Sequence, residues 1–157
     1  RVLEIVGKLL GVADAQRVWR AMDAGVSAAA QSIPERARNA RVYFEVNSAP
    51  YAAGESSFIG ETLTRLGARN IVPAALGPFP KINPEFVVRA NPDVIMVGDA
   101  TFAGMAQRPG WAGMPAIKVK RICVFTPEQS DIMVRPGPRM AEAARLMAEC
   151  LKDKAPS

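Results

Sequence analysis

Histidine is absent from this 157-residue chain. Its absence removes the most common general base, the most common transition-metal ligand and any Ser–His or Cys–His catalytic pair. Chemistry based on lysine, glutamate or tyrosine is not excluded, but the composition argues against catalysis. We therefore expect a protein that is not an enzyme and that has no metal site and no cofactor of its own.

Cysteine is nearly absent as well, because the chain contains only Cys123 and Cys150. Their spacing is not that of a CxxC motif and no histidine accompanies them, which argues against a zinc site. Cys123 lies in an apolar, strand-like segment and Cys150 lies in the last helical segment. Two buried thiols are the simpler interpretation. The alternative is a disulfide between a strand and a helix, which an oxidising compartment would permit.

Long apolar runs are also missing. None reaches the roughly 18 residues that a membrane-spanning helix requires, so we expect no membrane insertion. The net charge of +5 raises the question of nucleic acid binding. However, basic and acidic residues are interspersed, and the tightest basic cluster (Lys118, Lys120 and Arg121) has no interleaved aromatic side chains on which bases would stack. We expect no nucleic acid partner.

The chain begins at Arg1, inside an apolar segment with helical periodicity and without a methionine or a cleavable leader. We interpret it as a processed or truncated product. Its length fits one domain. Residues 152–157 are polar and include Pro156, so disorder is expected only there.

Helical and strand-like segments alternate along the chain. Residues 2–33 have helical periodicity, interrupted by glycines, and form either one long helix or two. Trp19 and Trp111 have helical spacing and apolar neighbours, and we expect both in the core. Strands are expected at 41–46, 70–72, 93–97 and 121–125, with helices at about 58–66 (Ser56 as N-cap), 84–89, shortly after 111, and 138–151.

This alternation predicts the α/β class: a Rossmann-like lobe with a short, mostly parallel sheet flanked by helices and preceded by a long helix. We divide the chain into a connecting helix (1–36), a lobe (37–152) and a tail (153–157).

Five short segments occur in a characteristic order: Gly54–Glu61, Gly77–Pro80 leading into Asn83–Glu85, Asn91–Ile95, Arg108–Trp111 and Arg135–Arg139. From about residue 41 to 151 this order resembles the carboxy-terminal lobe of class III, helical-backbone periplasmic binding proteins of ABC importers. Residues 2–33 resemble the helix that joins the two lobes in that family. The resemblance implies a periplasmic or lipid-anchored substrate-binding component, whose amino-terminal lobe would precede Arg1.

The resemblance also implies a role for Glu85. It stands where the second lobe of this family presents a glutamate to arginines of the membrane-spanning permease. Such an exposed charge sets orientation and association rate more than affinity. The alternative is a carboxylate that only stabilises the start of its own helix.

The same resemblance implies a ligand cleft between two lobes, to which this lobe contributes Phe79, Asp131 and Arg135. Glu45 stands at the end of the first strand and Tyr51 in the loop after it, so we expect both at the cleft as well. Phe79 and Tyr51 would offer flat apolar contacts to a broad macrocycle. Asp131 and Arg135 would exchange hydrogen bonds with its amide periphery. The alternatives are that Phe79 packs into the core, that Tyr51 is an ordinary exposed loop residue, and that Asp131 and Arg135 form a surface ion pair.

Within this family the chain resembles members that bind corrinoids such as vitamin B12, and this resemblance implies a corrinoid as the ligand. Haem or a ferric siderophore is the alternative metal chelate; haem needs a tyrosine or histidine ligand, and the lobe has only Tyr43 and Tyr51. A small enzyme or nucleotide-binding domain would need a glycine-rich phosphate loop after a strand, and Gly54 alone does not supply it. A third hypothesis is an oligomerising lobe, with the apolar stripe of the first helix packed on a second copy.

Overall fold

The computed structural model describes residues 2–47, 50–98, 102–134 and 139–156, except for the side chains of residues 2–13 and 134. The α-helices are α1 (Val2–Gln31), α2 (Phe58–Arg65), α3 (Pro84–Ala90), α5 (Pro115–Lys118), α6 (Pro127–Val134) and α7 (Met140–Lys154). The strands are β1 (Arg41–Asn47), β2 (Tyr51–Ala52), β3 (Arg69–Asn70), β4 (Val94–Gly98) and β5 (Ile122–Phe125). Short 3-10 helices are η1 (Glu35–Ala37), η2 (Ala74–Leu76), η3 (Met105–Gln107) and η4 (Trp111–Gly113).

The sheet is mostly parallel, as predicted. Strand β4 lies between β1 and β5 and is parallel to both. The outer edge of β1 pairs with β3 in parallel near its start and with β2 antiparallel near its end. The α/β prediction is therefore confirmed. The two-residue strand β2 was not predicted, because two residues give no periodic pattern.

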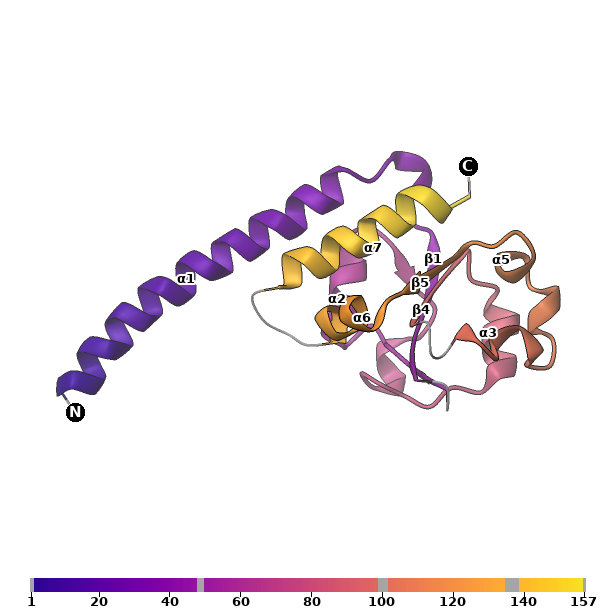
Figure 1. Ribbon diagram of the computed structural model, residues 1–157, viewed down its shortest axis with the longest axis horizontal. Coiled ribbons are helices and arrows are strands. Elements are labelled where there is room, and N and C mark those ends of the chain that lie inside the picture. Colours follow the sequence, from indigo (N-terminus) through magenta and orange to yellow (C-terminus); the bar gives the residue numbers. More distant parts are fainter. Residues whose placement is uncertain (1, 48–49, 99–101, 135–138, 157) are drawn as a thin grey trace.

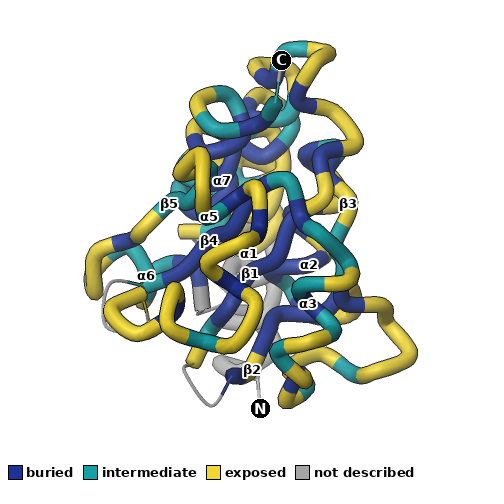
Figure 2. The backbone as a smooth tube through the Cα atoms, turned by 90° about the vertical axis from the view of Figure 1, so that its right-hand side faces the viewer, coloured by how far each residue is buried: buried dark blue, intermediate teal, exposed yellow. Residues whose placement is uncertain are grey.

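Alternate residues of the central strands enter two separate cores. Val42 and Phe44 of β1 join the core beneath α1, α2 and α7, whereas Tyr43 points to the opposite face, toward α3 and η4. Strand β4 divides in the same way and is buried on both faces (Figure 2). This two-sided burial explains the continuous apolar runs of these strands.

Helix α1 is continuous over 30 residues and longer than the rest of the lobe requires. Its second half lies beside α7, while its first half extends away from the other elements (Figure 1). Gly25 marks the close approach of the two helices, since a Cβ there would lie 2.6 Å from the Cβ of Ala141. Trp19 lies before this contact and is 57% exposed, so its predicted place in the core is wrong. Helical spacing showed an apolar position but not whether anything covers it.

The two cysteines form a disulfide that joins β5 to α7, with Cα atoms 6.0 Å apart. The interpretation as free thiols is thus wrong, and the alternative is confirmed. The predicted tail is also ordered in part. Helix α7 continues to Lys154, and the Arg36 guanidinium donates hydrogen bonds to the carbonyl oxygens of Lys152 and Ala155 at the end of that helix.

Two local predictions need correction. The N-cap of α2 is Ser57 rather than Ser56, and its hydroxyl accepts a hydrogen bond from the backbone N–H of Gly60 at 3.0 Å. Residues 127–134 form helix α6, where neither a helix nor a strand was predicted. Eight residues with little amphipathic pattern offer a weak helical signal, and Pro127 at the first position is the cue that was overlooked.

Candidate functional site

Two loops lie against each other beyond the end of β1. Backbone hydrogen bonds run from Ala52 N to Pro80 O (3.0 Å), from Gly54 N to Pro78 O (2.8 Å) and from Ile82 N to Pro50 O (2.9 Å). The second loop contains several prolines, which restrict its path. The paired loops therefore form a stiff platform rather than two independent segments.

Glycine at two positions permits this pairing. A Cβ on Gly54 would collide with the carbonyl oxygen of Gly77, and Gly77 itself has φ of 94°. The paired loops carry the exposed aromatic side chains Tyr51 and Phe79, whose exposed fractions are 40% and 44%. We call this area the Tyr51–Phe79 surface.

The Tyr51–Phe79 surface lies at the carboxyl edge of the parallel strands, where open α/β sheets bind their ligands. Asp131 also follows a carboxyl end, because α6 comes directly after β5, and it is exposed. Hydrogen bonding by Glu142 raises the pKa of Arg139, and the charge of Asp131 adds to this effect. Arg135 lies outside the described residues.

Glu45 does not reach this surface, contrary to the expectation from its place near the strand end. The residue is 1% exposed. Its two carboxylate oxygens accept hydrogen bonds from the guanidinium of Arg108, at 2.6 and 2.8 Å, and one also accepts the hydroxyl of Tyr43 at 2.7 Å. We therefore leave Glu45 out of the ligand surface. Its side chain points into the face of the sheet that carries α3 and η4.

The electrostatics of this buried group follow from its geometry. Burial, and then the neighbouring charge of Glu45, raise the pKa of Tyr43 above its ordinary value near 10. Hydrogen bonding to Glu45 raises the pKa of Arg108. Tyr43 is thus a neutral donor at physiological pH, and its hydroxyl is already engaged.

Trp111 continues this group of contacts, and its predicted burial is confirmed at 0% exposure. The guanidinium carbon of Arg108 lies 4.6 Å from the centre of the indole, a cation–π contact. The indole N–H donates to the backbone oxygen of Pro84 at 3.1 Å. Sequence reasoning missed Arg108, since its partner is 63 positions away; its place in the Arg108–Trp111 segment was the only available signal.

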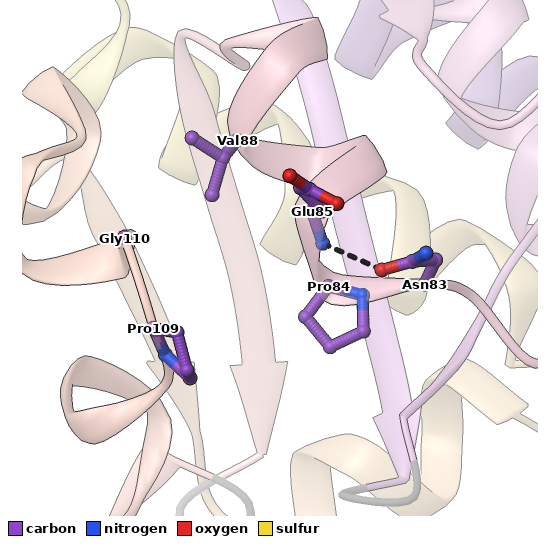
Figure 3. Close-up of a pocket in the computed structure, with 6 residues that line it drawn as sticks. All are labelled: Asn83, Pro84, Glu85, Val88, Pro109 and Gly110. Carbon is purple, nitrogen blue, oxygen red and sulfur yellow. Dashed lines mark hydrogen bonds between the residues drawn. The ribbon is translucent and has the colours of Figure 1, made fainter.

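Glu85 is exposed in the first turn of α3. The helix begins as predicted: the side chain of Asn83 accepts a hydrogen bond from the backbone N–H of Glu85 at 2.9 Å, and Pro84 occupies the first position. A hollow of about 480 Å³ lies beside it, with Pro84, Glu85 and Val88 on one side and Pro109 and Gly110 on the other (Figure 3). We call it the α3 pocket.

A second hollow of about 440 Å³ runs along edge strand β5. Phe102 follows the carboxyl end of β4, but its side chain lines this hollow together with Ile122 and Val124. Lys120 and Lys154 stand among these apolar side chains. Phe102 is therefore an exposed aromatic that sequence reasoning did not single out and that does not belong to the Tyr51–Phe79 surface.

Within the described residues, no cluster of three or more acidic or cysteine side chains is placed to hold a metal ion. The helices of the same part of the chain include none that is both long and apolar enough to cross a membrane.

The fold is that of a solute-binding lobe. A haem-binding periplasmic protein in complex with two haems is 25% identical, with a TM-score of 0.71 over 95% of this chain and 59% of its own. A possible iron-binding solute-binding protein from Staphylococcus epidermidis is 23% identical, with a TM-score of 0.76 over 94% and 58%. The vitamin B12-binding protein of Vibrio cholerae is 18% identical, with a TM-score of 0.70 over 90% and 53%.

A sequence profile described as "Periplasmic binding protein" matches residues 1–129. The chain belongs to this periplasmic binding protein family, which confirms the resemblance drawn from its motifs. It spans little more than half the length of the similar solved structures. No curated protein matches the sequence significantly.

Proposed function

We propose that this chain is the carboxy-terminal lobe and connecting helix of a substrate-binding protein that delivers a metal chelate to an ABC importer, in the periplasm or anchored by lipid at the cell envelope. The observation that carries the proposal is the Tyr51–Phe79 surface. It presents two exposed aromatic side chains on a stiff platform at the carboxyl edge of the parallel strands, in a chain of the periplasmic binding protein family.

The proposed ligand is a corrinoid, with haem or a ferric siderophore as the alternative. All three are bulky, and the first two are broad, flat macrocycles that suit aromatic contacts. Haem also needs an axial ligand. Tyr43 cannot serve, because it is fully buried and its hydroxyl is bonded to Glu45. Tyr51 is therefore the tyrosine of this lobe that haem iron would require, unless the other lobe supplies the ligand.

Two substitutions in the two-lobed protein separate corrinoid from haem, with cyanocobalamin and haemin as probes in visible-light titrations. Phe79→Ala removes an aromatic face and should weaken a corrinoid by about tenfold, because buried aromatic contacts are worth on the order of 1–2 kcal/mol. Tyr51→Phe keeps the ring and removes the phenol, so a corrinoid should lose little.

Loss of the haemin Soret shift in Tyr51→Phe, with Phe79→Ala less affected, would establish haem and reject the corrinoid. Failure of both probes to bind the unsubstituted protein would reject both macrocycles and leave the siderophore.

The two-lobe cleft has its own test. A single lobe leaves one face of a bound macrocycle in water, so the 157-residue chain should bind the successful probe far more weakly than the two-lobed protein does. Equal affinity would refute a shared cleft.

Glu85 is the proposed docking residue for the permease. It is exposed, acidic and held on a capped helix beside the α3 pocket, which suits an arginine or lysine side chain. Glu85→Ala should slow association with the permease, more so at low ionic strength. Glu61→Ala is the matched control, since Glu61 is also exposed in the first turn of a helix, α2. If both variants associate with the permease at the same rate, Glu85 has no docking role and only stabilises its own helix.

Our third hypothesis is that the lobe oligomerises through α1. It is supported by one feature: the consecutive apolar residues Val18 and Trp19 of this helix are both exposed. Gel filtration of the 157-residue chain tests it, and a monomer would reject it.

A further inference from the structure

Glu45 is the one charged residue among the buried residues that the structure describes. A buried ion pair is costly to desolvate and adds little net stability compared with apolar side chains of similar size. The ligand surface does not use this pair, because Glu45 and Arg108 point to the face that carries α3. The Glu45–Arg108 pair is therefore of interest for the segments of the chain that it joins.

A continuous set of contacts leads from Glu45 to the docking turn. The Arg108 guanidinium is held by both carboxylate oxygens of Glu45 and lies over the indole of Trp111. The indole N–H then donates to the backbone oxygen of Pro84. Pro84 directly precedes Glu85 in the first turn of α3. We call Glu45, Arg108 and Trp111 the Glu45 network.

This network reaches both walls of the α3 pocket. One wall is the start of α3, fixed at Pro84 by the indole. The other wall is Pro109 and Gly110, which follow Arg108 directly. Gly110 has φ of 83°, and a Cβ there would lie 3.5 Å from a methyl carbon of Val88, so the two walls approach each other closely at this point. The rigid interior of the sheet thereby sets the spacing of the pocket.

We infer that Arg108 and Trp111, anchored on Glu45, are positioning residues for the Glu85 carboxylate and hold the α3 pocket open for one long cationic side chain of the permease. This inference rests on the proposed docking role of Glu85. Helix α3 has only seven residues and Glu85 stands in its first turn, so a small rotation of that turn would redirect the carboxylate. The indole N–H ties the backbone oxygen of Pro84 to the interior of the lobe and so opposes this rotation.

The test is a double-mutant cycle on the two-lobed protein and its permease in nanodiscs, with affinity measured by biolayer interferometry. Trp111→Phe keeps an aromatic ring in the core and removes the N–H, and it should weaken permease binding by about three- to tenfold. Glu85→Ala should weaken binding as well. The double variant should bind no more weakly than Glu85→Ala alone, because both the indole and the pocket contribute to binding only by seating the cation that pairs with that carboxylate.

Hydrogen exchange supplies a readout that general destabilisation would not reproduce. In Trp111→Phe the backbone amides of Glu85 and Phe86 should exchange faster, while those of α2 keep their rates. Arg108→Lys retains the charge and loses the two-point contact, and should lie between the unsubstituted protein and Trp111→Phe in permease affinity. Arg139→Lys, in an exposed ion pair with Glu142, is the control and should change nothing.

The outcomes are distinct. Undiminished permease binding by Trp111→Phe, or effects of Trp111→Phe and Glu85→Ala that add, overturns the positioning role while leaving Glu85 as the docking residue. An inert Glu85→Ala overturns the docking role and the positioning role together.

Discussion

The disulfide between Cys123 and Cys150 allows a quantitative stability prediction. Its partners are 27 residues apart, so opening it frees a loop of that size in the unfolded chain. The loop-entropy relation gives a loss of about 3.5 kcal/mol in the free energy of unfolding. For a chain of this length the melting temperature should fall by roughly 7–14 °C. The bond joins edge strand β5 to α7, so its loss should loosen that edge first.

The measurement is thermal and urea unfolding of the Cys123→Ala/Cys150→Ala chain, compared with the oxidised chain. Alanine is chosen because Cys150 is buried and a serine there would add an unpaired hydroxyl. The reduced parent should melt near the double variant, and reductant should not affect the double variant. A difference below about 1 kcal/mol would refute the reasoning, because the cross-link would then barely restrict the unfolded ensemble.

Three further predictions concern the interior. Arg108→Met leaves a buried carboxylate without its partner and should cost about 3 kcal/mol in urea unfolding, whereas Arg139→Met at the surface should have little effect. The pKa of Tyr43 is raised in the folded state, so above pH 10 unfolding releases its proton. The free energy of unfolding should therefore fall there by up to about 1.4 kcal/mol per pH unit. Urea unfolding at a series of pH values should show a shallower fall for Tyr43→Phe. Gly25→Ala should destabilise the lobe by about 1–3 kcal/mol although alanine has the better helix propensity, because its Cβ would collide with Ala141. Adding Ala141→Gly should restore part of the loss. A gain in stability from Gly25→Ala would show that α1 and α7 separate freely.

The sequence was sufficient for the architecture because its signals are periodic and local. Apolar runs such as Val94–Val97 are typical of buried parallel strands, and Asn83-Pro84-Glu85 carries a complete helix start within three residues. Trp19 shows the limit of such signals. Its spacing predicts an apolar contact, but burial depends on contacts with other segments, which spacing within one helix does not reveal, and Trp19 is exposed.

The candidate site was predicted less well, because its chemistry depends on contacts between distant segments. Glu45 was assigned to the ligand from its position at a strand end. Its true surroundings depend on Arg108, which no local pattern connects to it. Tyr51 and Phe79 are exposed, as a place at the cleft requires, but their shared platform depends on backbone hydrogen bonds between two loops. Whether they contact ligand stays a prediction.

The positions of the motif segments explain why family resemblance predicts this fold better than its ligand. The segment from Gly54 contacts the loop from Gly77, where two backbones meet without room for a side chain. The segment at Pro84 contacts the one at Trp111, through the indole hydrogen bond. These segments meet in pairs that join the elements of the lobe. In our proposal ligand choice depends on exposed side chains. Tyr51 lies outside the five segments, and Phe79 lies within one of them but is exposed, so substitutions of these two side chains should change the ligand without disturbing the lobe.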